Sequence, residues 1–173
     1  MLADIRQRLR LPVIQAPMFL VSGPAMVIAA CRAGIIGSFP TQNLRDDAEL
    51  EGWFAAIDAA TGTKGGCAPY AVNVIVHPSY PRREQDIAAV LKWKPPIVIT
   101  ALGSPARVIE TVHGYGGLVF ADVGSIAMAR KAAQAGVLYS LAFGDQPALI
   151  CDLVDWARTC GFPVVAAGRG HKW

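Results

Sequence analysis

Short runs of β-branched residues alternate along this chain with longer alanine-rich segments that have the period of a helix. This order is typical of parallel strands joined by crossover helices. The hydrophobic share of 53% and the charged share of 17% suit a sheet that is covered on both faces. The pattern predicts an α/β fold of parallel βα repeats in a single domain, residues 1–173. The expected strands are Val13–Ala16, Ile35–Phe39, Tyr70–Val76, Ile97–Ala101, Leu118–Val123, Leu138–Phe143 and Val164–Ala167.

Serines and prolines mark where several helices should begin. Ser22, Ser104 and Ser125 each place a hydroxyl where it can accept a hydrogen bond from an unpaired amide of the first turn. The expected helices are Pro24–Ala33, Asp46–Ala60, Arg82–Trp93, Pro105–Gly114, Ser125–Ala135 and Pro147–Cys160. Three of them are followed by a glycine suited to a left-handed cap, namely Gly34, Gly136 and Gly161.

Composition and charge exclude several classes of function. The 16 basic and 13 acidic residues give a net charge of +3, and the basic residues are too scattered for a nucleic-acid interface. The four cysteines form no Cys-x-x-Cys pair, which favours reduced thiols and no metal site. No apolar run approaches the roughly 20 residues of a membrane span. We expect a soluble, cytoplasmic protein that acts on a small molecule.

In parallel folds of this kind, ligands bind at the carboxyl ends of the strands. Asn73 interrupts an otherwise apolar strand, where an unpaired amide would cost on the order of 1–3 kcal/mol. It should therefore contact either a ligand or another polar group across the interior. Thr100 and Ser104 flank the exit of the next strand and could line the same face, although Ser104 is also explained as a helix cap.

Several segments fall in an order and spacing that resemble the nitronate monooxygenase family, formerly called 2-nitropropane dioxygenases. The resemblance covers about residues 1–137. The segments that carry it are Leu11-Pro-Val-Ile-Gln-Ala-Pro-Met18, Ala33-Gly-Ile-Ile-Gly-Ser38, Phe39-Pro-Thr-Gln-Asn43, Tyr70-Ala-Val-Asn-Val-Ile-Val-His77, Pro96-Ile-Val-Ile-Thr-Ala-Leu-Gly-Ser-Pro105 and Val112-His-Gly-Tyr-Gly-Gly-Leu-Val-Phe-Ala-Asp-Val123.

This resemblance implies a TIM barrel with FMN across the carboxyl ends of its strands, and the oxidation of alkyl nitronates with O₂. The cofactor-binding residues it suggests are Ala16, Pro17, Met18, Asn73 and Thr100. The locked φ of Pro17 fixes the backbone direction after the first strand, so that neighbouring amides and carbonyls can face a flat polar ring edge. The alternative is a plain tight turn with Met18 as apolar filler.

His77 is a candidate base, because it follows a strand directly and imidazole titrates near neutrality. His113 instead ends an expected helix, where a cation interacts favourably with the dipole. Asp122, at the end of the fifth strand, either orients a ligand or caps the following helix, and we favour the cap.

The family pattern breaks after about residue 137, where the catalytic histidine loop of such an enzyme should follow. The glycine-rich loops that would bind the FMN phosphate are also missing, so activity is in doubt. Residues 138–173 resemble part of homoserine dehydrogenase-like proteins, but no Gly-x-Gly-x-x-Gly fingerprint is present. A catalytically silent chimeric βα-repeat protein without cofactor is one alternative, and an NAD(P)-dependent dehydrogenase is a lesser one.

Seven expected strands are one fewer than a closed barrel needs, so the resemblance implies a partial or incomplete TIM barrel. Such a sheet leaves an open strand edge, which a second copy of the chain would cover in a homo-oligomer.

Overall fold

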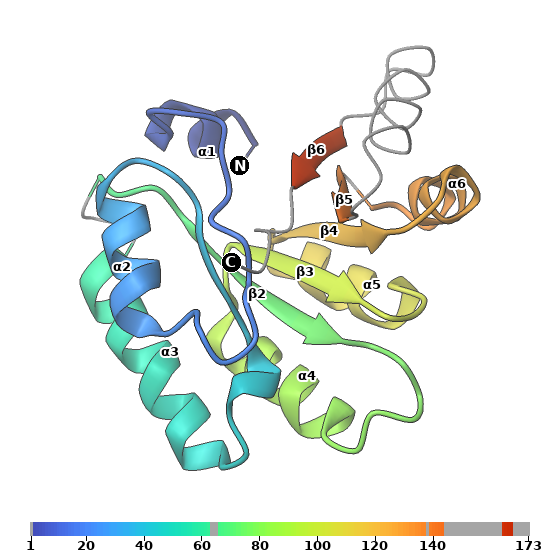
Figure 1. Cartoon of the computed structure of the whole chain (residues 1–173), viewed down its shortest axis with the longest axis horizontal. Coiled ribbons are helices and arrows are strands. Elements are labelled where there is room, and N and C mark those ends of the chain that lie inside the picture. Colours follow the sequence, from blue (N-terminus) through green and yellow to red (C-terminus); the bar gives the residue numbers. More distant parts are fainter. Residues whose placement is uncertain (1, 63–65, 138, 144–163, 168–173) are drawn as a thin grey trace, which may run out of the picture.

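The computed structural model describes residues 2–62, 66–137, 139–143 and 164–167. They form one sheet whose strands lie side by side in sequence order (Figure 1), and every neighbouring pair is parallel. The predicted α/β class with parallel βα repeats is confirmed. The strands are β1 (Gly37–Pro40), β2 (Tyr70–Ile75), β3 (Ile97–Ala101), β4 (Leu118–Val123), β5 (Tyr139–Phe143) and β6 (Val164–Ala167).

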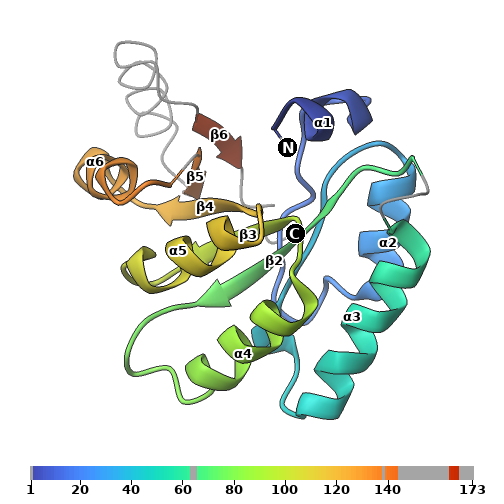
Figure 2. The same cartoon turned by 180° about the vertical axis from the view of Figure 1, so that it is seen from behind.

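Helices surround the outer face of this curved sheet, as Figures 1 and 2 show from opposite sides. An additional helix near the N-terminus, which the sequence pattern did not predict, lies beside the ends where the strands begin. The described helices are α1 (Leu2–Arg8), α2 (Pro24–Arg32), the 3₁₀ turn η1 (Thr41–Asn43), α3 (Asp47–Thr61), α4 (Arg83–Trp93), α5 (Ala106–Gly114) and α6 (Ile126–Gln134).

The two faces of the sheet carry separate apolar cores. Residues of alternate strand positions, such as Val72 and Val98, pack with the helices in the larger core. The other positions, such as Ala71 and Ile99, form a smaller core on the interior face, and Ile5 of α1 joins it. Because side chains alternate along a strand, this division tells which strand residues can face a ligand in the interior.

The first predicted strand is reduced to a single parallel bridge between Ile14 and Ile36 at the outer edge of β1. At the other end, β5 pairs with β4 and β6 pairs with β5. The parallel sheet therefore continues beyond the point where the family pattern breaks. No described strand pairs with the outer edge of β6, so the sheet forms a partial barrel as far as the structure describes it. The helix predicted over Pro147–Cys160 lies outside the described residues.

Helix boundaries agree with the sequence predictions to within a residue or two, but the capping side chains differ. The predicted cap at Ser125 is confirmed, because its hydroxyl accepts from the Met128 amide at 3.2 Å. The predicted cap at Ser22 is wrong, since its hydroxyl binds groups of the preceding loop and α2 has no side-chain cap. Asp46, which the sequence analysis overlooked, caps α3 through the Ala48 amide.

Two of the three predicted glycine caps have the expected left-handed backbone, with φ of 83° at Gly34 and 92° at Gly136. Gly161 lies outside the described residues. In the part of the chain that the structure describes, no helix has both the length and the apolar character needed to cross a membrane.

Candidate functional site

The register of the sheet places one polar side chain in the middle of the interior face. Pro40, Asn73, Ile99 and Phe120 occupy equivalent positions in the first four strands. Ile99 and Phe120 belong to the interior core, so the same layer of the sheet presents Asn73 to the interior. An amide thus stands among apolar neighbours near the carboxyl ends of the strands.

Asn73 is buried, with 8% of its surface exposed. Its Nδ2 donates to the carbonyl oxygen of Ile99 at 3.2 Å, which satisfies one part of the amide. This is the one side-chain hydrogen bond of Asn73 among the described residues, and it does not involve Oδ1. Ile99 is the residue paired with Asn73 on the neighbouring strand β3, so this bond lies within the sheet and is not the predicted bond across the interior. The amide still has capacity for a ligand.

The loop after the first strand-like segment is held by a compact set of hydrogen bonds around Ser22, which is fully buried. Its hydroxyl accepts from the Met18 amide at 2.9 Å and from Gln15 Nε2 at 2.9 Å, and donates to the Ala16 carbonyl at 3.1 Å. Gln15 Oε1 in turn accepts from the Ser38 amide of β1 at 2.9 Å. The turn predicted to contact the flavin, Ala16–Met18, is thereby fixed to the sheet.

Asn43 holds the same loop from the other side. Its Oδ1 accepts from the Leu20 amide at 2.7 Å, and its Nδ2 donates to the Ser22 carbonyl at 2.8 Å. Leu20 has a positive φ of 62°, a conformation that a leucine rarely adopts without such support. Asn43 ends the 3₁₀ turn directly after β1, so the loops that follow the first two strand segments form one unit.

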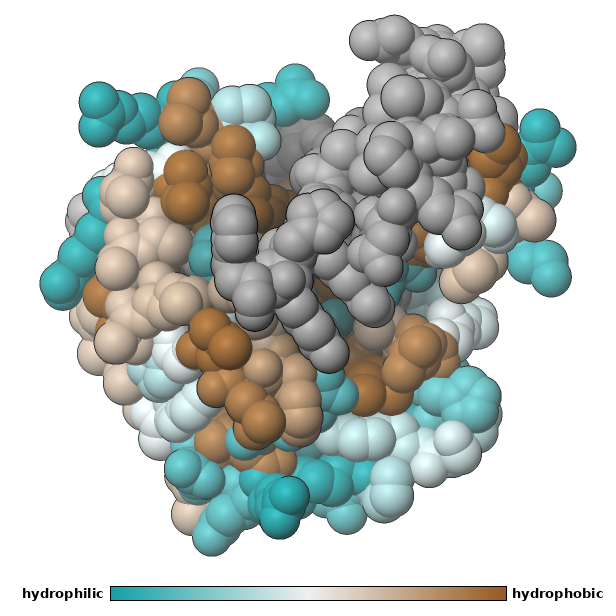
Figure 3. All heavy atoms as spheres, in the orientation of Figure 1, coloured by the Kyte–Doolittle hydropathy of each residue, from teal (hydrophilic) through white to brown (hydrophobic). Residues whose placement is uncertain are grey.

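Four consecutive apolar side chains project from this loop into solvent. Met18, Phe19, Leu20 and Val21 are between 38% and 76% exposed. The space-filling view shows apolar residues on this face of the molecule beside polar ones (Figure 3). Since the backbone of the loop is fixed by hydrogen bonds, these side chains form a stable apolar rim beside the predicted cofactor turn. We call Met18–Val21 the apolar rim.

Thr100 lies on the opposite face of the sheet from Asn73. It alternates with Ile99, and it shares its face with Val98, which packs against the helices. Its hydroxyl donates to the Phe120 carbonyl at 3.2 Å, and the residue is 2% exposed. Because this hydroxyl is used within the helix-covered layer, we leave Thr100 out of the proposed site.

His77 lies two residues beyond the end of β2 and is exposed. Its Nδ1 is 2.7 Å from the hydroxyl of Ser79 and accepts from the Ser79 amide at 3.2 Å. Its Nε2 has no hydrogen-bond partner among the described residues. The structure thus places His77 on the surface just after β2, and its catalytic role stays a prediction. His113 is in the last turn of α5, away from the strand exits.

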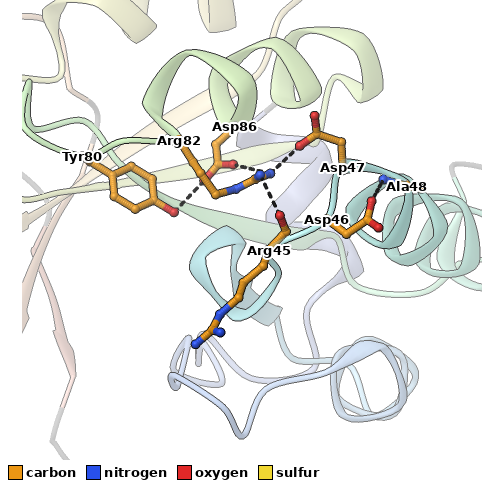
Figure 4. A network of polar contacts seen from close by, with 7 residues as sticks. All are labelled: Arg45, Asp46, Asp47, Ala48, Tyr80, Arg82 and Asp86. Carbon is orange, nitrogen blue, oxygen red and sulfur yellow. Dashed lines mark hydrogen bonds and ion pairs between the residues drawn. The ribbon is translucent and has the colours of Figure 1, made fainter.

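A polar cluster joins the segments that follow β1 and β2 (Figure 4). Arg82 Nη1 donates to the Arg45 carbonyl at 2.9 Å, and Nη2 pairs with the Asp47 carboxylate at 2.5 Å. Nη2 also lies 3.5 Å from Asp86 Oδ1, while the Tyr80 hydroxyl donates to Asp86 Oδ2 at 3.1 Å. The sequence analysis missed this cluster, because Arg82 and Asp47 are 35 residues apart.

Asp86 is the buried member of the cluster, with no exposed surface. Burial raises the pKa of its carboxyl, while nearby Thr41, Tyr80 and Arg82 oppose that shift. Burial and the neighbouring Asp86 also raise the pKa of Tyr80, to about 12. The phenol therefore stays protonated and keeps donating to the carboxylate throughout the physiological range.

Metal chemistry has no ligand set in the described part of the chain. No group of three or more His, Cys, Asp or Glu side chains lies close enough there to hold a metal ion. The candidate site instead consists of amides, hydroxyls and apolar side chains at the carboxyl ends of parallel strands. This set of groups suits a flat organic cofactor with polar edges better than a cation.

The chain is similar in structure to FabK from Thermotoga maritima and to nitroalkane oxidase from Streptomyces ansochromogenes. A point variant of that FabK has a TM-score of 0.80 and 21% identity, covering 96% of this chain and 56% of the other. The nitroalkane oxidase has a TM-score of 0.76 and 20% identity, covering 94% of this chain and 60% of the other. The chain thus spans between about half and three fifths of the length of these structures.

At this level of identity the likenesses show the fold, a parallel βα barrel of which this chain forms a part. A family described as the catalytic domain of oxidoreductase DRL matches residues 144–173, most of which lie outside the described residues. Comparison with curated proteins gave no match. None of these comparisons supports the resemblance of residues 138–173 to homoserine dehydrogenase-like proteins.

Proposed function

We propose that this chain binds FMN against the turn Ala16–Met18 and Asn73, and that it is an FMN-dependent oxidoreductase of nitronate monooxygenase type. The observation that carries the proposal is Asn73, a buried amide on the interior face whose one described side-chain hydrogen bond does not involve Oδ1. The structural likeness to a nitroalkane oxidase and the oxidoreductase family match at the C-terminal end support the same class of chemistry.

The side chain of Asn73 and the turn Ala16–Met18 offer polar groups that match those on the edge of a flavin ring. Asn73 Oδ1 offers an acceptor for the ring N–H, and the turn at Pro17 offers main-chain groups beside the apolar rim. Bound FMN would take up electrons from the substrate and pass them to O₂. The protein would hold the ring edge, keep it in one orientation through the fixed loop, and exclude water on the side of the rim.

The apolar rim suggests the class of substrate within this proposal. An alkyl nitronate has a small anionic head and an apolar tail, and exposed Phe19 and Leu20 would contact such a tail. We therefore expect turnover to improve with alkyl chain length over the first few carbons, measured as O₂ uptake with a series of primary nitronates.

A catalytically silent protein without cofactor remains the second candidate. It is favoured by the sequence after residue 137, which lacks the Gly-Gly-His-x-Gly loop of nitronate monooxygenases. Binding of FMN distinguishes the two candidates directly. A flavin binder should be yellow when purified or should quench added FMN fluorescence, whereas the silent protein should do neither.

Replacing Asn73 by leucine should weaken FMN binding about 10-fold, since it removes a hydrogen bond to the ring and leaves the apolar packing intact. The measurement is a fluorescence titration of FMN with N73L and with the wild type. Thr100→Val is the matched control, because it removes a buried hydroxyl that also bonds a strand carbonyl but on the helix-covered face.

We expect T100V to change FMN affinity less than about 2-fold, within the spread of substitutions that touch no ligand. Equal weakening in both variants would mean that the affinity follows sheet stability, and that Asn73 does not contact the cofactor. An absence of FMN binding by the wild type would remove the proposed function and favour the silent protein.

A further inference from the structure

The loop that carries the predicted cofactor turn depends on a residue far from it in sequence. Asn43 ties Leu20 and Ser22 to the segment after β1, through contacts of 2.7 and 2.8 Å. That segment runs from Thr41 to Asp47. Thr41 and Leu44 are buried, and Leu44 packs in the helix-covered core, whereas the segment beyond Leu44 is exposed. What fixes the segment therefore also fixes the loop.

Arg82 holds this segment at two points. Its guanidinium reaches both the Arg45 carbonyl and the Asp47 carboxylate, which only a forked side chain can do at once. Figure 4 shows the guanidinium between these two groups, with the Arg45 side chain directed away from the cluster. Arg82 itself belongs to the loop after β2, next to the start of α4.

Asp86 and Tyr80 fix Arg82 from the side of α4. Asp86 is buried one helical turn beyond Arg82, and its amide donates to the Arg82 carbonyl at 2.9 Å. Its carboxylate faces the guanidinium and receives the Tyr80 hydroxyl. Two short turns connect this cluster to the exit of β2. In the first the Tyr80 amide donates to the His77 carbonyl, and in the second the Arg83 amide donates to the Tyr80 carbonyl.

We propose that Arg82 is a positioning residue for the cofactor turn, acting through the Thr41–Asp47 segment and Asn43 on the loop Met18–Ser22. This inference rests on the proposed function for its ligand, FMN, but the coupling of the two loops can be measured without it. Arg82 touches no ligand in this scheme. It selects one arrangement of the groups that do.

The experiment compares Arg82→Gln with Arg83→Gln. Arg83 is the adjacent arginine, and its guanidinium pairs with Glu84 and not with the cluster. R82Q leaves the Asp86 carboxylate buried without its cation, so the double variant R82Q/D86N is measured as well, because it leaves the net charge of the cluster unchanged. R82K keeps the charge beside Asp86 but cannot reach both the carbonyl and Asp47.

Two readouts are taken on the full chain. Amide hydrogen exchange without FMN should become faster at residues 41–47 and at residues 18–22 in R82Q/D86N and R82K, and stay unchanged in R83Q. The dissociation constant of FMN should rise about 3- to 30-fold in the Arg82 variants, the range of couplings through packed networks. R82K should regain resistance to urea while its FMN affinity stays weakened, which a purely structural role would not produce.

The inference is overturned if exchange rises at residues 41–47 and not at 18–22, because the coupling would then end at Asn43. It is also overturned if R83Q weakens FMN binding as much as the Arg82 variants do. If the wild type binds no FMN, the proposed function fails, and the exchange data alone decide whether Arg82 positions the loop.

Discussion

Replacing Gly37 by alanine should lower the free energy of unfolding by about 3 kcal/mol, near the upper end of what overpacking costs. A Cβ at this position would lie 2.3 Å from the Val27 carbonyl oxygen and 2.9 Å from the Val27 Cα. These are backbone atoms in the middle of α2, and they cannot rotate away as the end of a side chain can. To admit the methyl group, α2 must move off β1, which opens the helix-covered core around Val27.

Gly52→Ala is the matched control for this prediction. Gly52 lies in α3, and nothing is within 4 Å of the position where its Cβ would be. The alanine there should stabilise the chain by about 0.5–1 kcal/mol through helix propensity. Urea unfolding followed by circular dichroism measures both variants. If G37A unfolds at the same urea concentration as the wild type, the close contact between α2 and β1 is absent in solution.

The same glycine illustrates how much of the fold was predictable. Strand and helix periods give most elements to within one or two residues, because each period is local to its own segment. They do not show which glycine lies under a helix, since that depends on how closely two elements approach. The short helix α1 was also missed, because seven residues carry too little periodicity to be distinguished from a loop.

Asn73 was predictable as part of a site, and Arg82 was not. An amide inside an apolar strand conflicts with its surroundings, and a single segment of sequence shows that conflict. Arg82 is an ordinary basic residue at the start of an ordinary helix. Its importance comes from Asp47 and the Arg45 carbonyl, which are brought to it only by the pairing of β1 with β2.

Hydroxyl groups were the least predictable polar side chains. The sequence predicts Ser22 as a helix cap and Thr100 as a ligand contact. In the structure Ser22 binds its own loop and Thr100 binds the neighbouring strand. A serine or threonine hydroxyl can reach a nearby backbone group as easily as a helix amide or a ligand. Which of these it bonds depends on the local backbone geometry, which residue types alone do not determine.

Replacing Ser22 by alanine should weaken FMN binding about 100-fold, which corresponds to about 3 kcal/mol for three hydrogen bonds of ordinary strength. The hydroxyl connects the Met18 amide, the Gln15 side chain and the Ala16 carbonyl. Without it, the amide and the carbonyl of the cofactor turn lose their shared partner in a fully buried place. The turn should then sample several conformations, of which few can hold a ring edge.

Ser125→Ala separates this effect from a general loss of stability. Ser125 caps α6 through the Met128 amide, and removing it should cost roughly 1 kcal/mol of unfolding free energy, as for other caps. FMN titration and urea unfolding are measured on both variants. If S125A weakens FMN binding as strongly as S22A, the measured affinity reflects only the fraction of protein that is folded, and the prediction for Ser22 is wrong. If the turn binds the flavin, S22A should lose FMN affinity while most of the protein is still folded. The reason is that the flavin contacts depend on the local order of residues 16–18.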